Sequence, residues 1–372
     1  MKTLSTDRKT NWYSLTREGW QQFLSEIDNR SFRAQQVMKW IYHERVASIE
    51  TMSNLSKNFR SALASSTENT LPKLIHTNTS RDGTVKWIVE TESGGAVECV
   101  LIPDGRRNTL CISSQLGCSL DCIFCATGKQ GFAGNLSVAD IVGQVVIVTD
   151  WLRLNSNYGE LTNIVFMGMG EPLMNFAATM DACDIFMDDL AFGISKRRVT
   201  ISTAGVVPRI LDMCRRTEAS LAVSLHAAND EVRNFLVPLN KKYPIAMLMD
   251  ACREYLSSLH DRRIVTFEYT LIEDINDGDQ AAKELVQLLR DFRCKVNLIP
   301  FNPFPLSTFR RPTENKILRF YKQLRDEGIM VTNRTTRGED IDAACGQLIG
   351  DFQDKTRRRA RYRSAQSEAS IV

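Results

Sequence analysis

The spacing of apolar residues changes from helical to strand-like about eighty residues into the chain. Over residues 12–27 and 33–46 apolar side chains recur on one helical face, and a third helix is expected over 55–63. The apolar positions of the first two faces are Trp20, Phe23, Leu24, Ile27, Val37, Trp40 and Ile41. The pattern therefore predicts a small helical domain at the N-terminus.

Strand patterns dominate the rest of the chain. Two runs, 85–90 and 96–102, flank the turn Ser93-Gly94-Gly95 and predict a hairpin. From residue 109 onward, short runs rich in β-branched residues alternate with amphipathic helical patterns. The six expected strands are 109–113, 163–167, 198–202, 220–225, 264–271 and 295–300.

Helices are expected between these strands and after the last of them. The pattern over 138–152 is helical, with Ser137 and Asp140 placed for a capping box, and 279–292 and 314–327 are helical too. A short strand is expected at 329–333. Such alternation favours a parallel α/β sheet or barrel with functional residues at the carboxyl ends of the strands. Six units rather than eight predict an incomplete (βα)6 TIM-like barrel.

These patterns divide the chain into four parts. We expect an N-terminal helical accessory domain (1–84), a β-hairpin linker (85–108), a barrel with a C-terminal loop (109–348) and a basic tail (349–372). Residues 1–60 carry ten basic and six acidic side chains, and 355–363 carry six basic ones. Both ends are candidates for RNA contact, and an ordinary solvated surface is the alternative interpretation of each.

Composition excludes several classes of protein. With 43% hydrophobic and 24% charged residues, the 372-residue chain is neither disordered nor fibrous. It has no apolar run long enough for a membrane helix, and its N-terminus lacks the apolar core of a secretory signal, so a cytoplasmic location is expected. The net charge of +3 indicates no partner. In a reducing compartment, ten cysteines indicate metal binding or catalysis rather than disulfides.

Cys118, Cys122 and Cys125 form the most informative string, a CxxxCxxC on a loop after the first strand of the βα series. A tetrahedral zinc site needs four ligands, whereas three thiolates can bind three irons of a [4Fe–4S] cluster and leave the fourth iron open. S-adenosylmethionine (SAM) can chelate an open iron through its amino and carboxylate groups. Three packed thiols are the alternative, and it is disfavoured by Phe124, an aromatic residue before the last cysteine that is typical of the superfamily named next.

This spacing resembles that of the radical SAM superfamily. By resemblance, the Gly-rich turn that contains Gly170 and Glu171 holds the amino group of SAM. Polar residues also end later strands, where they suit hydrogen bonds to ribose or adenine. Single residues of this kind are ordinary caps, so the expectation depends on their joint placement. The expected contacts are Ser202, Ser224, Leu225, His226 and Asn302.

Glu98, Cys111 and Cys345 narrow the resemblance from the superfamily to one of its families. Together with the strings at 116–118, 128–132 and 168–175, they make the chain similar to the dual-specificity RNA adenine C2 methyltransferases (RlmN) over nearly its whole length. Cys345 lies in a polar loop, although a free cysteine is most often a small buried hydrophobe. Alternation along 109–113 could likewise bury Cys111. The remaining cysteines, Cys99, Cys183, Cys214, Cys252 and Cys294, are expected to be structural.

The resemblance implies a role for each of the three residues. One SAM methylates Cys345, and a second SAM, reduced at the open iron, supplies a radical that takes a hydrogen from that methyl group. The resulting methylene adds to C2 of adenine, and Glu98 removes the C2 proton as general base. Cys111 then attacks the Cys345 sulfur, which releases the methylated RNA and leaves a transient disulfide.

The resemblance also implies the substrates and partners. They are an adenosine of 23S rRNA at the peptidyl-transferase centre and the adenosine 3′ of the anticodon in some tRNAs. A flavodoxin-like electron donor, two SAM molecules per turnover and a monomeric enzyme without membrane contact are expected. One rival is the related C8 methyltransferase Cfr, which shares the cluster and both cysteines, although the N-terminal domain and overall length favour C2. A rival of another class is a non-catalytic RNA-binding protein with a structural metal.

Overall fold

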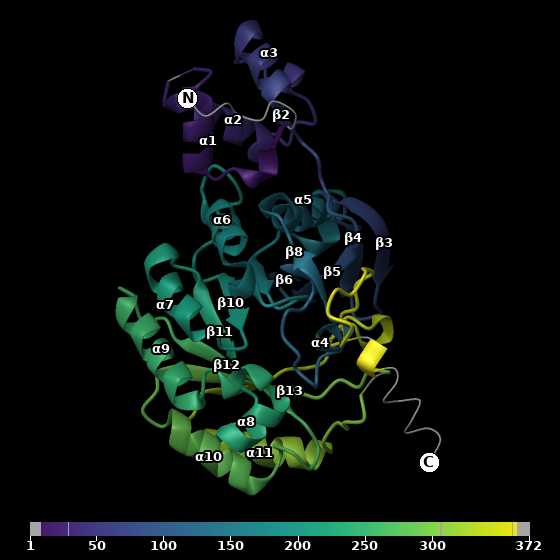
Figure 1. Cartoon of the computed structure of the whole chain (residues 1–372), viewed down its shortest axis with the longest axis vertical. Helices are drawn as coiled ribbons and strands as arrows, with labels where there is room; N and C mark the ends of the chain where they lie inside the picture. Colours follow the sequence, from purple (N-terminus) through teal and green to yellow (C-terminus); the bar gives the residue numbers. More distant parts are fainter. Residues whose placement is uncertain (1–8, 29, 306, 359, 363–372) are drawn as a thin grey trace.

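The computed structural model describes residues 9–28, 30–305, 307–358 and 360–362, and it consists of a small helical unit beside a larger α/β body (Figure 1). The N-terminal unit contains α1 (Arg17–Ser25), α2 (Phe32–Met38) followed by a π turn (Lys39–His43), and α3 (Lys57–Ser66). β1 (Thr10–Asn11) pairs in parallel with β2 (Thr67–Glu68) and joins the two ends of the unit. The three predicted helices are confirmed: the first two are shorter than expected, and the third is shifted by two to three residues toward the C-terminus.

The first predicted helix begins later than its apolar pattern suggests. Residues Trp12–Ser14 form a separate 3₁₀ turn, and α1 starts after Thr16, whose hydroxyl accepts a hydrogen bond from Gly19 N. The N–H groups of the first helical turn have no carbonyl partner within the helix, and this N-cap supplies an acceptor for one of them. Trp20 is completely buried in the unit.

A ten-stranded sheet forms the centre of the body, and its strands lie in the order β14-β13-β12-β11-β10-β9-β6-β5-β4-β3. Strands β6 and β9 to β14 pair in parallel, whereas β3 to β6 pair antiparallel. The strands are β3 (Lys73–Thr79), β4 (Val85–Glu90), β5 (Ala96–Asp104), β6 (Arg107–Cys111), β9 (Asn163–Phe166), β10 (Val199–Thr203), β11 (Ser220–Ser224), β12 (Val265–Leu271), β13 (Cys294–Pro300) and β14 (Val331–Asn333).

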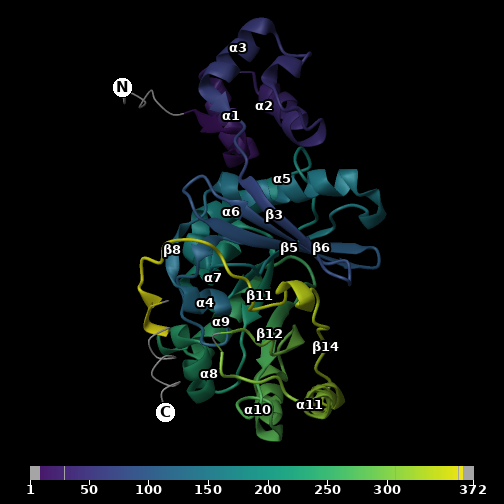
Figure 2. The same ribbon diagram turned by 90° about the vertical axis from the view of Figure 1, so that its right-hand side faces the viewer.

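All six strands expected for the βα series are present as β6 and β9 to β13, and they are neighbours in chain order. β14 and β3 stand at opposite edges, so the sheet stays open and the predicted incomplete barrel is confirmed. The 85–102 hairpin also forms, as β4 and β5, but it is part of the main sheet rather than a linker beside it. In Figure 2, β3, β5 and β6 form the upper part of the sheet and continue it beyond the other parallel strands.

Helices cover the sheet and connect its parallel strands (Figures 1 and 2). The predicted capping box of α5 is present: Ser137 Oγ accepts from Asp140 N at 3.0 Å, and Asp140 Oδ2 accepts from Ser137 N at 3.2 Å. No helix of the described residues is long and apolar enough to cross a membrane. The helices of the body are α4 (Ala126–Gln130), α5 (Val138–Leu154), α6 (Phe176–Met187), α7 (Val207–Arg216), α8 (Asp230–Leu236), α9 (Ile245–Ser258), α10 (Asp279–Leu289) and α11 (Glu314–Asp326).

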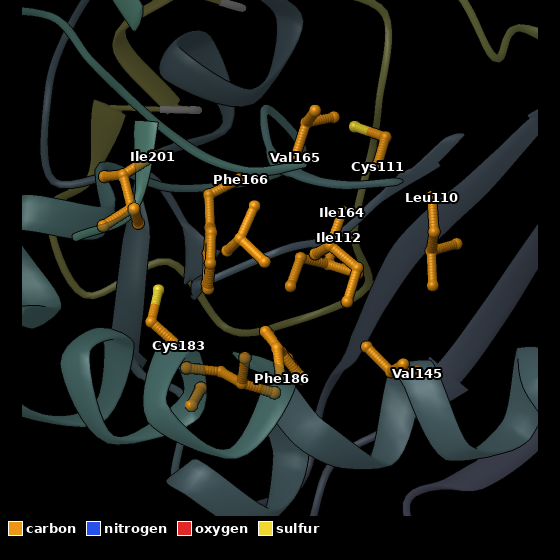
Figure 3. Close-up of a cluster of buried hydrophobic side chains, with 14 of the residues drawn as sticks. Leu110, Cys111, Ile112, Val145, Ile164, Val165, Phe166, Cys183, Phe186 and Ile201 are labelled. Carbon is orange, nitrogen blue, oxygen red and sulfur yellow. The ribbon is translucent and has the colours of Figure 1, made fainter. Parts of the chain in front are cut away.

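The core between the sheet and helices α5 and α6 is apolar and closely packed. Figure 3 shows Leu110 and Cys111 on opposite faces of β6, with Leu110 directed toward Val145 of α5. Cys183 of α6 is fully buried in this core, as Cys99 and Cys252 are elsewhere, in agreement with a structural role for these three cysteines. Cys111 is buried too, but on the face turned away from the helices.

Candidate active site

A cavity of about 160 Å³ lies at the carboxyl ends of the parallel strands, where this architecture places its sites. Most of the residues predicted for cofactor binding line it. They come from the cysteine loop, from the turn after β9, from the ends of β10 and β11, from the segment after β13 and from the C-terminal loop. They are Cys118, Cys122, Cys125, Gly170, Glu171, Ser202, Ser224, His226, Asn302 and Cys345.

The cysteine loop joins β7 (Gln115–Gly117) to α4 and directs its three thiols at the cavity. Leu120 N donates to Cys118 Sγ at 3.4 Å, and Cys125 N donates to Cys122 O at 3.3 Å, so the loop is wound tightly. Gly128 is required by this winding, since a Cβ there would lie 2.8 Å from Cys122 O. The loop backbone thus fixes where the three sulfurs lie.

The thiols fit a [4Fe–4S] cluster better than a single metal ion. No group of three or more Cys, His, Asp or Glu side chains in the described part of the chain converges as ligands of one ion would. A cluster needs no such convergence, because each thiolate binds a different iron. Burial raises the pKa of Cys118, Cys122 and Cys125, and metal ions bound at the sulfurs would stabilise the thiolate forms.

Glu171 is a buried carboxylate held by backbone donors. Leu173 N donates to its Oε1 at 3.0 Å and Ala204 N to its Oε2 at 2.7 Å. Burial nevertheless raises the pKa of Glu171 to about 7. Gly170 before it has φ +99°, and a Cβ at this position would lie 2.6 Å from the Gln115 side chain. The carboxylate can therefore receive an ammonium group from the cavity, which would stabilise its charged form.

His226 is neutral in this site. Its Nδ1 accepts a hydrogen bond from Thr270 N at 3.0 Å, and its ring meets Phe124 edge-on at 4.4 Å between centroids. Burial lowers the pKa of His226 to about 3, so the ring presents no charge to the cavity. The side chain of Leu225 is fully buried in the core and does not line the cavity, so a ligand contact at this position would come from its backbone.

Asn302 joins the cavity to the C-terminal loop. Its Nδ2 donates to Cys345 O at 3.1 Å, and its Oδ1 accepts from Thr336 Oγ1 at 3.1 Å. The amide thereby holds the loop that carries Cys345 against the end of β13. Ser202 and Ser224 lie at the ends of the neighbouring strands β10 and β11, as the sequence predicts.

Cys345 and Cys111 face a common space. A second cavity of about 60 Å³ adjoins the first, and Cys345 lines both of them while Cys111 lines the second. Burial, reinforced by the nearby charge of Cys345, raises the pKa of Cys111 to about 12. Arg334 lines both cavities, and the Cys345 charge raises the pKa of this guanidinium. The arrangement suits a pair of thiols that exchange a bond beside a fixed cation.

Glu98 lies behind the C-terminal loop and lines neither cavity. Only 4% of it is exposed; its Oε1 is 3.1 Å from Lys86 Nζ, and its Oε2 accepts from Ile349 N at 3.0 Å. Lys86 Nζ also donates to Asp342 O at 3.2 Å. Burial raises the pKa of Glu98, and this effect is larger than the lowering caused by the nearby Lys86 charge. The pair ties β4 and β5 to both sides of the loop that carries Cys345.

Sequence reasoning missed Glu268 and Arg334. Glu268 lies on β12 opposite Ser224 and lines the main cavity; its Oε1 accepts from Asn297 Nδ2 at 2.8 Å, and its buried Oε2 has no partner among the described residues. A buried unpaired oxygen beside a cavity is typical of a ligand contact. An acidic residue within the apolar strand 265–271 was the signal that could have found it.

Comparison with known proteins identifies the family. Residues 10–68 match the profile of the ribosomal RNA large subunit methyltransferase N-terminal domain, and residues 112–288 match that of the radical SAM superfamily. The dual-specificity RNA methyltransferase RlmN of Marinomonas sp. (strain MWYL1) is 53% identical over 365 residues, 95% of this chain and 97% of that relative. The chain belongs to the RlmN family of dual-specificity RNA methyltransferases.

A second relative and a solved structure support this family assignment. The RlmN protein of Marinobacter nauticus (strain ATCC 700491 / DSM 11845 / VT8) is 52% identical over 96% of this chain and 97% of its own. The crystal structure of a radical SAM methyltransferase from Sphaerobacter thermophilus matches with a TM-score of 0.84 at 42% identity, over 91% of this chain and 99% of that chain. The predicted radical SAM fold is thereby confirmed, and with it a [4Fe–4S] cluster and SAM as the cofactors.

Proposed function

We propose that the protein methylates C2 of an adenosine in 23S rRNA at the peptidyl-transferase centre, and of the adenosine 3′ of the anticodon in some tRNAs. Membership of the RlmN family supports RNA as the substrate. The observation that carries the proposal is the placement of Cys345, which lines the cysteine-loop cavity and also the smaller cavity of Cys111. One thiol can therefore take a methyl group on one side and be resolved on the other.

The chemistry of the target explains why two thiols are needed. Carbon 2 of adenine is electron-poor and does not attack the methyl group of SAM, whereas a carbon radical can add to it. When bound to Cys118, Cys122 and Cys125, a [4Fe–4S] cluster supplies the electron that cleaves SAM. Cys345 first takes a methyl group and later carries the carbon that adds to the ring. Arg334 lines both cavities together with Cys345 and brings a fixed positive charge to the wall that they share.

The other site residues bind, orient or move protons. Glu171 and Gly170 would hold the SAM ammonium, and Ser202, Ser224, His226 and the backbone at Leu225 would face its ribose and adenine. Asn302 positions the Cys345 loop. Glu98 would act as the general base for the C2 proton; its raised pKa suits this task. It reaches the substrate only if the loop that covers it moves, since Ile349 N now occupies its Oε2.

We further propose the N-terminal unit within 1–84 as an accessory RNA-binding domain, the match at 10–68 being its support. The protein would act as a cytoplasmic monomer and receive its electron from a flavodoxin-like protein. Residues 109–348 would form the catalytic barrel with its C-terminal loop. Residues 1–8 of the predicted first domain lie outside the described residues.

Nucleoside mass spectrometry of 23S rRNA tests the target base and the reaction together. In a strain that lacks the gene, 2-methyladenosine should disappear from the fragment that contains the peptidyl-transferase centre, and a plasmid copy should restore it. Unchanged 2-methyladenosine would contradict the proposal. Loss of 8-methyladenosine instead would identify the Cfr-type reaction.

SAM affinity tests the ammonium site. Because the Glu171 carboxylate would pair with the SAM ammonium, Glu171→Gln should weaken SAM binding by about tenfold or more, the size of one charge-assisted hydrogen bond. Protonation of Glu171 removes the same attraction. Since its pKa is raised to about 7, wild-type affinity should fall as the pH drops below 7, and the variant should lose this dependence. Equilibrium dialysis with labelled SAM measures both effects, and a pH dependence that survives in Glu171→Gln would refute the assignment.

A further inference from the structure

The C-terminal segment packs along the outside of the cysteine loop. In Figures 1 and 2 the yellow end of the chain runs beside α4. Thr127 Oγ1 donates to Leu348 O at 2.8 Å, and Gln130 exchanges hydrogen bonds with the backbone of Gly350 at 3.0 and 3.2 Å. Lys355 N donates to Phe132 O at 3.0 Å. We call residues 350–358 and 360–362 the C-terminal strap. Arg359 and residues 363–372 of the predicted tail lie outside the described residues.

Two glycines of the cysteine-loop region make room for the strap. A Cβ at Gly131 would lie 2.0 Å from Asp354 Oδ1, and a Cβ at Gly117 would lie 2.5 Å from the Phe352 ring. Both glycines also have positive φ, at +92° and +74°. The strap is therefore seated at both ends of the loop by positions that accept no side chain.

Arg358 is the centre of this contact. Only 7% of it is exposed, whereas the sequence pattern places it in a solvated or RNA-binding basic run. Its Nη1 donates to Leu120 O at 2.5 Å and to Gly128 O at 3.0 Å, and its Nη2 donates to Ser119 O at 3.1 Å. Two of these carbonyls lie between the first two cysteines, and the third lies after the last cysteine. The guanidinium thus bridges the two ends of the cysteine loop.

The geometry of this bridge requires an arginine. A guanidinium presents five N–H donors in a fixed plane, so one side chain serves three carbonyls at once. A lysine has a single nitrogen on a flexible stem and cannot span them in the same way. Without the guanidinium, three backbone oxygens of the loop would lose this donor, one of them in a buried and two in a part-buried position.

Arg358 also brings a positive charge to the cysteines. Its guanidinium donates to the carbonyls of Ser119 and Leu120, the two residues that directly follow Cys118. Nearby, Tyr362 Oη donates to Asp121 Oδ1 at 2.9 Å, which fixes the strap to the loop a second time. Charge and hydrogen bonding around thiolate ligands are the factors that set the potential of an iron–sulfur cluster.

We propose that Arg358 is a positioning residue that holds the cysteine loop in its ligand geometry from outside and whose charge raises the reduction potential of the cluster bound there. This inference rests on the proposed function only in that the ligand of the loop is a [4Fe–4S] cluster. It explains why a basic tail residue points away from solvent, into the backbone of the loop.

Reconstituted full-length protein tests the proposal with two measurements. The first is the rate at which a chelator removes iron, and the second is the midpoint potential of the cluster followed by electron paramagnetic resonance. Arg358→Ala should lose iron at least fivefold faster than wild type, and its potential should shift to more negative values. Arg358→Lys should keep most of the potential, because it keeps the charge, but should also lose iron faster. Lys355→Ala is the control, since the side chain of this strap residue is exposed and its backbone N–H, which the substitution keeps, donates to Phe132 O.

Thermal unfolding of the cluster-free variants shows whether they fold, and Arg358→Lys carries the test if Arg358→Ala does not. A wild-type rate of iron loss in Arg358→Lys, or an Arg358→Ala potential equal to that of wild type, would overturn the inference. Neither result would affect the proposed function, which fails only if the wild-type protein itself binds no SAM-responsive cluster.

Discussion

Replacing Cys345 with alanine should abolish RNA methylation while the cluster and SAM binding remain. The side chain lines the cavity of the cysteine loop, but the loop's own backbone and Arg358 hold the three ligand cysteines without it. Because Cys345 would carry the transferred carbon, no other thiol can replace it, and activity should fall by at least about a thousandfold, as when a covalent nucleophile is removed. Transfer of labelled methyl groups from SAM to a 23S rRNA fragment measures the loss.

The same variant should also lose the methyl group on the protein itself. Intact-protein mass spectrometry of wild type should show a species heavier by one methyl group, and Cys345→Ala should not. Cys214→Ala is a matched control: Cys214 lies on α7, its thiol donates to Ile210 O, and it lines neither cavity. Methylation that survives in Cys345→Ala would remove Cys345 from the mechanism.

Local patterns predicted the parallel half of the fold well and the antiparallel extension poorly. The strands β6 and β9 to β13 are apolar because both their faces are covered, which produces a clear signal in the sequence. β3 was not predicted because it is an edge strand: Leu74 and Ile75 are 47% and 52% exposed, and its other residues are polar. Its place in the sheet is decided by pairing with β4, a contact that no local pattern contains.

The residues of the candidate site were likewise predicted only in part. Cysteine spacing and the convergence of parallel strands at their carboxyl ends sufficed to predict the cavity lining around Cys118 and Glu171. The burial of Arg358 was not predicted, because a run of basic residues is usually solvated, whereas Arg358 meets carbonyls that lie more than 200 residues earlier in the chain. Tertiary contacts of this kind leave no periodic signal. Arg334 was missed for the same reason, whereas Glu268 was marked by its place as an acidic residue in an apolar strand.

Under the proposed function, the two adjoining cavities would serve the two halves of the reaction. The larger one holds the residues that would bind SAM and the cluster, and the smaller one holds Cys111. Cys345, Asn302 and Arg334 lie on the shared wall. Only a thiol on this wall can meet a methyl donor on one side and a resolving thiol on the other. The positions therefore support the proposal that Cys111 carries out the later step, release of the product.

Replacing Cys111 with alanine should trap the protein covalently on its RNA. In the intact protein the Cys111 thiolate would attack the Cys345 sulfur: an S–S bond forms, the bond from that sulfur to the RNA-bound carbon breaks, and the carbon keeps the electron pair and takes up a proton. Without Cys111 the carbon–sulfur bond has no nucleophile nearby. An RNA–protein band that survives denaturing electrophoresis should accumulate, approaching one per chain, with turnover reduced by at least about a hundredfold.

The double variant Cys111→Ala/Cys345→Ala decides what holds the RNA, since it should form no such band. The adduct of the single variant should contain Cys345 when the nuclease-treated protein is digested and sequenced by mass spectrometry. Turnover at the wild-type rate by Cys111→Ala, with no adduct, would mean that another group resolves the intermediate. The burial of Cys111 shapes the expected rate as well: with its pKa raised to about 12, the thiol ionises only with help, and the Arg334 guanidinium on the shared wall is placed to supply it.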